Sequence, residues 1–380
     1  MCGKPPQRRK SKHLFFKLSK FSGWLEKYIH EKPLPGDIVN YLRTWIKEGL
    51  ADWDITRDGP YFGIPIPGED NKFFYVWYDA PIGYVSSTLH YCKGNRSEFE
   101  EWWKSPETEI VHFIGKDIIY FHFLFWPAML LEAGYNIPHR IPTRGHATLN
   151  GEKMSKSRGT LIGLSEFLDK YPADFLRYYY TAITPNSSAD ANFSWDEFAA
   201  KINGEFVGAI CNYNYRVLSF LARNFEGRVP VPKTADFPTD ADRAFNGKID
   251  AFPERLASHL EQIELKAGLE EVMAFAAECN RYFNGRAPWK LAKEKPDEAA
   301  AVLFLAAKAA YALALHLSPF VPAYAQKIYS QLGFPGSADE ARWGDLSALA
   351  PGAKLGNPEI VQRPIDRKAI EEENERISQA

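Results

Sequence analysis

The chain has 380 residues, of which 45% are hydrophobic and 14% aromatic, enough to fill more than one globular core. Its net charge of −2 gives no general attraction to nucleic acid, so an RNA contact would need local basic and aromatic patches. Four separated cysteines without a C-x-x-C pair predict reduced thiols. We find no signal peptide and no run near the roughly 18 apolar residues of a membrane span, so we expect a cytoplasmic protein.

Residues 1–72 are expected to form an accessory region. Residues 13–21 have the composition of a short strand, and residues 24–51 have the pattern of two helices. The Pro- and Gly-containing segment 32–36 should separate these helices, because proline interrupts helical hydrogen bonding.

Residues 73–185 alternate between strand-like and helical patterns. Continuous apolar runs occur at 73–77 and 110–114, and helical patterns begin at Gly83 and Ile118. Apolar runs without polar alternation suit strands that are covered on both faces. We therefore predict an α/β fold with a parallel sheet and crossover helices.

Residues 186–350 are expected to form an all-α helical bundle, and residues 351–380 a linker and charged helix. Ser194 and Glu197 have the spacing of a capping box just after a polar break. Apolar residues at helical spacing then follow over four segments, 198–221, 241–259, 262–283 and 299–317.

The loop Lys153-Met154-Ser155-Lys156-Ser157 has the composition of a phosphate-binding loop. Two ammonium groups separated by hydroxyl-bearing residues can stabilise the charge that develops as pyrophosphate leaves a nucleoside triphosphate. Taken alone, the same five residues could also be a solvated polar turn. The neighbouring motifs are therefore needed to distinguish a phosphate-binding loop from a solvated turn.

Those surroundings resemble methionyl-tRNA synthetases, which are class I aminoacyl-tRNA synthetases. The resemblance is specific from about residue 73 to residue 289 and weaker beyond it. It implies a Rossmann-type catalytic domain, present in part, followed by an anticodon-binding helical bundle. The motifs that carry it, besides the loop, are Trp77 to Tyr84, Gly115-Lys116-Asp117 and Arg144-Gly145-His146.

The resemblance implies that Lys156 contacts ATP and that Lys153 assists it. With Mg²⁺ as a companion of ATP, the remaining ATP-site residues would be Gly115, Lys116, Asp117 and His146. The turn at Gly115 ends a predicted strand, which is where doubly wound sheets bind ligands. An ordinary strand-to-helix turn with Asp117 as N-cap remains an alternative.

A methionine pocket is also implied by the resemblance. Its residues would be Trp77, Ala80, Pro81, Tyr84, Ile118 and His122. Aromatic walls suit a polarisable thioether, and a hydroxyl or imidazole N–H can donate weakly to sulfur. His122 also lies on an apolar helical stripe, where it could simply be a core histidine.

Three residues of the predicted bundle match the family's readers of the CAU anticodon of tRNA-Met. Asn212 and Arg216 are four residues apart, so they project from one helix face, and Trp289 could stack on an unpaired base. A lone arginine and a Pro-Trp step are more often structural.

Two departures from the family pattern concern zinc and the phosphate signature. Cys2 resembles the last ligand of a zinc knuckle in an insertion of which residues 1–72 would be a remnant, but one cysteine cannot hold zinc, so we expect no metal site. The chain has no His-x-Gly-His string.

We therefore expect the C-terminal portion of a methionine–tRNA ligase, inactive alone. The alternatives are a subunit that needs a separate N-terminal half, and a non-catalytic tRNA-binding protein.

Overall fold

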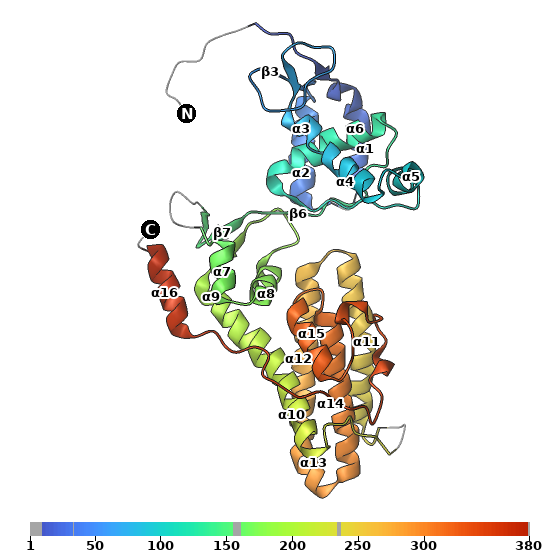
Figure 1. Ribbon diagram of the computed structural model, residues 1–380, viewed down its shortest axis with the longest axis vertical. Coiled ribbons are helices and arrows are strands. Elements are labelled where there is room, and N and C mark those ends of the chain that lie inside the picture. The colour runs from blue at the N-terminus through green and yellow to red at the C-terminus, as the bar shows by residue number, and fades with distance from the viewer. Residues whose placement is uncertain (1–9, 33, 155–160, 234–236, 379–380) are drawn as a thin grey trace. The chain divides into compact units, whose positions relative to one another are not determined.

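A computed structural model describes residues 10–378 except 33, 155–160 and 234–236. The chain divides into two compact units, and each has its own hydrophobic core (Figure 1). Unit 1 comprises Met1–Gly145 and Ser187–Ala189, and unit 2 comprises His146–Asn186 and Asp190–Ala380. The fold is a mixed α/β region followed by a helical domain, as the sequence predicts.

The described residues of unit 1 form three two-stranded ladders. The two antiparallel ladders pair β1 (Phe15–Phe16) with β2 (Trp53–Asp54), and β3 (Thr56–Asp58) with β4 (Lys72–Phe74). The prediction of one strand over 73–77 is wrong, because β4 ends at Phe74 and helix α3 (Val76–Asp79) begins two residues later. The periodicity of a short apolar run does not distinguish a strand from a helix. Here the strand extends only as far as its ladder with β3, which ends at Phe74.

The third ladder of unit 1 is parallel and confirms the predicted parallel pairing. It joins β5 (Ile114–Gly115) to β6 (Thr143–Arg144). The N–H groups of His112 and Ile114 donate to the carbonyls of Arg140 and Pro142, both over 3.0 Å.

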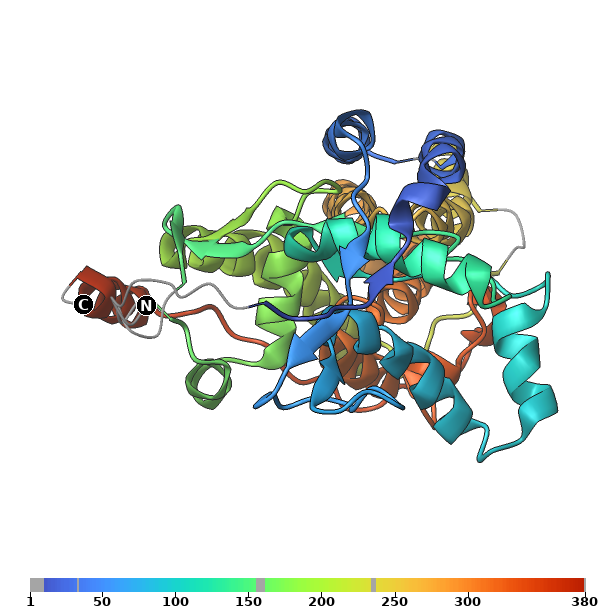
Figure 2. The same cartoon turned by 90° about the horizontal axis from the view of Figure 1, so that it is seen from above.

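The two helices predicted near the N-terminus are present as α1 (Ser22–Glu31) and α2 (Gly36–Glu48). They lie side by side (Figure 2) and bury leucine and isoleucine side chains against the segment after β5. The other helices of unit 1 are η1 (Leu18–Phe21), α4 (Ile82–Tyr91), α5 (Arg96–Lys104), η2 (Lys116–Ile118), the π-helix η3 (Phe121–Phe125) and α6 (Trp126–Glu132).

Unit 2 begins with a small sheet and three helices. In the sheet, β7 (Ala147–Leu149) pairs antiparallel with β8 (Glu152–Lys153) and parallel with β9 (Ala191–Phe193). Ser194 caps α9 as predicted, its hydroxyl accepting from the Glu197 N–H, but the Glu197 carboxylate instead accepts from the Tyr179 hydroxyl, 3.2 Å away. The helices here are α7 (Leu164–Lys170), α8 (Ala173–Ile183) and α9 (Trp195–Lys201).

A bundle of long helices forms the rest of unit 2. The π-helix η5 continues α9 into α10, and α14 packs against α10, α11, α12 and α15 (Figure 1). Alanines on α14 are fully buried, which lets neighbouring helices approach closely. The elements are η5 (Ile202–Cys211), α10 (Asn212–Asn224), α11 (Asp240–Glu261), α12 (Leu265–Arg286), α13 (Pro288–Glu294), α14 (Pro296–Leu317), α15 (Pro322–Gln331), η6 (Ala338–Glu340), η7 (Leu346–Ala348) and α16 (Arg367–Ser378).

Two carboxamide side chains hold the extended segment that leads to α16. Asn203 donates to the Ile365 carbonyl over 3.0 Å and accepts from its N–H over 2.7 Å. Gln331 binds both backbone groups of Glu359 in the same way, over 3.3 and 3.2 Å. Each side-chain amide bonds the backbone N–H and carbonyl of one residue, as a neighbouring strand would. The segment therefore keeps a defined path without regular secondary structure.

Helix α14 is long and apolar enough, by length and composition, to span a membrane. The sequence analysis expected no run of this kind. Because 83% of its most apolar window is buried inside the protein, α14 fits the role of a core helix.

Candidate functional site

An aromatic and imidazole cluster in unit 1 contains most of the predicted methionine-site residues. The Tyr84 hydroxyl, on α4, lies 3.0 Å from Nε2 of His122 on η3. Nδ1 of His122 lies 3.2 Å from the Ile118 carbonyl. Because a carbonyl only accepts, Nδ1 carries the proton, and Nε2 accepts from the Tyr84 O–H.

The protonation state of His122 follows from its burial. Removal from water lowers the pKa of His122, so the ring is neutral near pH 7. Its single N–H and the Tyr84 O–H are then both used within the protein. Neither group is therefore free to donate to a methionine sulfur, contrary to what the sequence analysis expected. The aromatic rings remain as the groups suited to a thioether.

Trp77 contacts Phe121, which directly precedes His122 on η3. The two rings stack with centroids 4.4 Å apart and planes inclined by 10°. Ala80 and Pro81 form the turn between α3 and α4, with Pro81 buried and Ala80 exposed. This short turn sets the spacing between Trp77 and Tyr84, so the predicted residues belong to one local arrangement.

His112 completes the cluster, and the sequence analysis did not predict it. Its Nε2 accepts from the Trp126 indole N–H over 3.1 Å, and its ring centroid lies 4.5 Å from that of Tyr84 and 5.8 Å from that of His122. Burial, and then the nearby His122, lower the pKa of His112 to about 4. A histidine inside an otherwise apolar strand run was the available signal.

The predicted ATP-site residues fall in both units. In unit 1, a Cβ on Gly115 would lie 2.7 Å from an Asp117 carboxylate oxygen, so glycine allows this carboxylate to fold back over the turn. Lys116 directly follows β5. The parallel strand therefore ends in a backbone turn with an exposed carboxylate, as the sequence predicts.

In unit 2, the His146 N–H donates to Asp190 over 2.8 Å and its side chain is exposed. Lys153 is also exposed, in β8 of the small sheet. Lys156 lies outside the described residues. The structure thus describes the strands that precede the lysine-containing loop but not Lys156 itself.

Arg216 and Trp289 both contact Phe283 of the helical bundle. The Arg216 guanidinium carbon lies 5.1 Å from the Phe283 ring centroid, and its Nη2 donates to the Asn284 side-chain oxygen over 2.8 Å. The Trp289 ring centroid is 5.9 Å from that of Phe283, with planes inclined by 61°. Phe283 therefore connects the two predicted residues and Asn284 holds Arg216; the sequence analysis missed both.

Asn212 lies one turn before Arg216 on α10 and is exposed. It lines a groove of about 160 Å³ together with Tyr215, Tyr324 and residues of the extended segment before α16. Asn212 thus occurs on the predicted helix, although this groove includes neither Arg216 nor Trp289.

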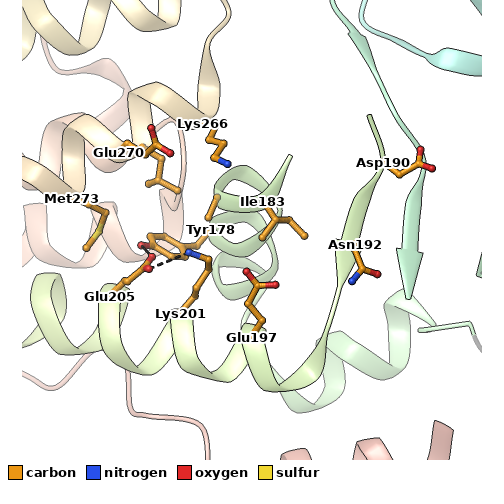
Figure 3. Close-up of a pocket in the computed structure, with 12 residues that line it drawn as sticks. Tyr178, Ile183, Asp190, Asn192, Glu197, Lys201, Glu205, Lys266, Glu270 and Met273 are labelled. Carbon is orange, nitrogen blue, oxygen red and sulfur yellow. Dashed lines mark hydrogen bonds and ion pairs between the residues drawn. The ribbon is translucent and has the colours of Figure 1, made fainter. Parts of the chain in front are cut away.

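A cavity of about 690 Å³ lies between α8, α9 and α12 of unit 2 (Figure 3). Among its lining residues, Glu205 accepts from the Tyr178 hydroxyl over 2.9 Å and from Lys201 over 3.1 Å. Burial raises the pKa of Tyr178, so its hydroxyl stays a neutral donor. None of the predicted ATP-, methionine- or tRNA-binding residues lines this cavity.

Metal-binding residues do not gather within the part of the chain that the structure describes, where no group of three or more His, Cys, Asp or Glu could hold an ion. Cys2 lies outside the described residues. The other cysteines, Cys92, Cys211 and Cys279, are free and buried, and burial raises the pKa of Cys211 to about 12. These thiols are therefore protonated near pH 7.

Two family profiles match nearly the whole chain. One, described as "tRNA synthetases class I (M)", matches residues 1–218, and the other, the "anticodon binding domain of methionyl tRNA ligase", matches residues 231–380. The chain belongs to the methionyl-tRNA synthetase family. The motif-based resemblance is thus confirmed at the level of the family.

Methionyl-tRNA synthetase relatives align along the entire chain. The methionine–tRNA ligase of Methanopyrus kandleri is 41% identical over 99% of the chain, and that of Myxococcus xanthus is 38% identical over 97%. These alignments cover 55% and 53% of the relatives, so the chain spans about half the length of the curated relatives it matches.

Solved methionyl-tRNA synthetase structures share the fold. The Mycobacterium tuberculosis enzyme in complex with methionyl-adenylate is 28% identical and superposes with a TM-score of 0.85, covering 95% of this chain and 71% of that one. Its free form superposes with a TM-score of 0.82 at 27% identity, covering 93% and 68%.

Proposed function

We propose that this chain supplies the methionine pocket and the tRNA-reading surface of a cytoplasmic methionine–tRNA ligase. The observation that supports this most directly is the hydrogen-bonded pair of Tyr84 and His122, with Trp77 stacked on Phe121, the residue directly before His122. A neutral, aromatic site of this kind favours an uncharged thioether side chain over a charged one. The structure of the M. tuberculosis relative contains methionyl-adenylate, which agrees with ATP-dependent activation of methionine.

The proposed reaction has two steps. The methionine carboxylate attacks the α-phosphate of ATP in line with the departing pyrophosphate, which gives methionyl-adenylate. A ribose hydroxyl at the 3′ end of tRNA-Met then takes the acyl group, and AMP leaves. Lys153 and Lys156 would stabilise the charge on pyrophosphate, while Gly115, Lys116, Asp117 and His146 would hold the nucleotide. Mg²⁺ would neutralise phosphate charge, and we assign no residue of this chain to it.

The proposed RNA-reading surface consists of Asn212, Arg216 and Trp289. Trp289 is 38% exposed, so one face can receive an unpaired base while the ring is supported by Phe283. The Arg216 guanidinium is held by Asn284 and Phe283, which reduces the entropy that it would lose on binding. A preformed cation beside an aromatic plane suits single-stranded RNA.

Two binding measurements with the full chain test this proposal. Calorimetry should show that L-methionine binds at least about tenfold more tightly than L-leucine. Fluorescence anisotropy should show that a CAU anticodon stem-loop binds more tightly than the same hairpin with a scrambled loop. Equal binding of both amino acids would contradict the methionine site, and equal binding of both hairpins would contradict the reading surface.

A second candidate function, a subunit that works with a separate N-terminal half, is supported by the parallel ladder of unit 1. Among the described residues β5 pairs with β6 alone, and Phe113 just before it is 64% exposed. An exposed strand edge beside an aromatic residue is a surface on which a further strand can pair.

The test is to add, as a separate polypeptide, the part of the M. kandleri relative that its alignment with this chain does not cover. If a separate half is required, methionine-dependent ATP–pyrophosphate exchange should occur only with both polypeptides. Replacing Phe113 with Asp should then reduce the exchange, while Phe62→Asp, at a fully exposed position, should not. Equal exchange by the chain alone would reject this candidate.

A further inference from the structure

Two helices of the bundle, α11 and α12, meet at one buried carboxylate, Asp242. This residue is fully buried in the first turn of α11. Its Oδ1 accepts from the Tyr282 hydroxyl over 2.7 Å and from Arg286 Nε over 2.8 Å. Its Oδ2 accepts from Arg286 Nη2 over 3.2 Å, and from the Thr239 hydroxyl over 2.7 Å and N–H over 3.2 Å. The carboxylate is thus satisfied on both oxygens.

Arg286 continues this network to a second carboxylate. Its Nη2 also donates to Glu298, in the first turn of α14, over 2.5 Å, and Lys295 lies 3.4 Å from the other Glu298 oxygen. One guanidinium therefore bridges α11, α12 and α14. The planar fork of arginine suits this role, since a lysine ammonium cannot bind two carboxylates with the same geometry.

The Arg286–Glu298 pair closes a loop of the chain that contains α13 and Trp289. Ala287, directly after Arg286, has φ of 41° and ψ of 60°, the left-handed conformation that residues with a side chain rarely adopt. It ends α12 and begins α13, two residues before Trp289. Strained backbone of this kind persists only where neighbouring contacts hold it.

We propose that Asp242, Arg286 and Glu298 are positioning residues that fix the α12–α13 corner and thereby the orientation of Trp289. They do not reach the bound RNA in this proposal; they act through the Trp289 ring and its contact with Phe283. The proposal rests on the anticodon-reading function proposed above. It adds a buried ionic network as the determinant of how well the tryptophan is presented.

The first test compares two arginine-to-lysine changes between the same pair of helices. Arg286→Lys keeps the charge that Asp242 needs but removes the fork, and Glu298→Gln keeps an acceptor but removes the second charge. Arg255→Lys is the matched control, since Arg255 on α11 also pairs with a carboxylate, Glu271 of α12, over 2.9 Å. Binding of CAU and scrambled stem-loops is measured by anisotropy, and folding by thermal unfolding.

We expect Arg286→Lys to weaken CAU binding by about two- to tenfold, with a smaller loss for Glu298→Gln and none for Arg255→Lys. The affinity for the scrambled hairpin should change little, so the CAU preference should decrease. A purely structural role would lower the melting temperature but leave that preference intact, and this result would overturn the proposal.

A double-mutant cycle separates this proposal from the underlying function. If Arg286 acts through Trp289, Arg286→Lys should have no further effect on CAU binding in a Trp289→Ala background. Additive losses would overturn the positioning role. An unchanged CAU affinity in Trp289→Ala alone would instead overturn the anticodon assignment itself.

Discussion

The two candidate sites are organised by opposite kinds of polar contact. In unit 1, Tyr84 is hydrogen-bonded to His122, and the ring of His112, whose Nε2 accepts from Trp126, lies against Tyr84; all of these groups are neutral. In unit 2, the surroundings of Trp289 are set by the ionic bridge from Asp242 through Arg286. When acid protonates a ring nitrogen, that nitrogen can no longer accept its hydrogen bond. When one partner of a buried ion pair is removed, the other charge is left unpaired and the fold is destabilised.

The hydrophobic cores of the two units also differ, in the size of their clusters of buried side chains. The core of unit 2 is one large cluster that includes fully buried Phe252 stacked on Phe275, with centroids 4.1 Å apart. Unit 1 divides its buried side chains between two smaller clusters, one beneath α1 and α2 and one at α4 to α6. We infer that the extensive packing of unit 2 can hold the strained backbone at Ala287 and the buried charges of Asp242 and Arg286 in place. Unit 1 depends more on single contacts such as the Tyr84–His122 hydrogen bond.

The largest expected effect is the loss of a core aromatic in unit 2. Phe252→Ala should lower the free energy of unfolding by about 3 to 5 kcal/mol, because it removes a stacked ring and leaves a cavity. Urea unfolding followed by far-UV circular dichroism measures this change. Phe62→Ala is the control at a fully exposed position, and equal effects of the two changes would contradict the assigned burial.

The next effect is the response to acid. The pKa of His112 is lowered to about 4, from an ordinary value of 6.5, so the unfolded chain binds a proton at a higher pH than the folded one. The stability from keeping His112 neutral is complete above pH 6.5 and is lost as the pH falls toward 4, about 3 kcal/mol in all. Unfolding free energies measured between pH 7 and 4.5 should show this slope.

His316 provides the matched histidine in the bundle. Burial also lowers its pKa to about 4, but its Nε2 has no partner among the described residues, whereas His112 Nε2 accepts from Trp126. His112→Gln should reduce the acid-induced loss of unfolding free energy in unit 1 and should also alter methionine binding. His316→Gln should reduce that loss in unit 2 only and leave methionine binding unchanged. Loss of methionine binding in His316→Gln would contradict this separation.

Arg216→Ala should weaken CAU stem-loop binding by about 1 to 3 kcal/mol, since it removes a cation that the bundle already holds in place. Asn212→Ala tests the neighbouring turn of the same helix. If Asn212 reads a base, its loss should reduce the preference for CAU over a scrambled loop, as measured by anisotropy. A preference unchanged in both variants would contradict the predicted reading surface.

The smallest expected effect is that of one hydroxyl in unit 1. Tyr84→Phe leaves Nε2 of His122 without its donor and should weaken methionine binding by about 0.5 to 1.5 kcal/mol in calorimetry. Tyr91→Phe, which alters an exposed tyrosine on the same helix, should leave binding unchanged. If both changes act equally, the hydrogen bond to His122 is not what organises the pocket.

Several features of this protein follow from the sequence alone, because local patterns encode them. Helical spacing and a proline-containing break predict α1 and α2, and Ser194 predicts the start of α9. The long apolar periodicities predict α11, α12, α14 and the continuous run from α9 to α10 to within a few residues, but not α13 or α15. The motif at Gly115 was predicted to follow a parallel strand, and it does.

Other features depend on partners that are distant in the sequence, so only the tertiary structure decides them. The strand β4 ends at Phe74 because β3 is its partner, and apolar composition alone could not set that end. His112, Phe283 and Asn284 have no sequence motif, and their roles appear only when Tyr84, Trp289 and Arg216 are packed against them. The ionic bridge at Asp242 joins residues 44 and 12 positions apart, and its burial arises from the packing of three helices.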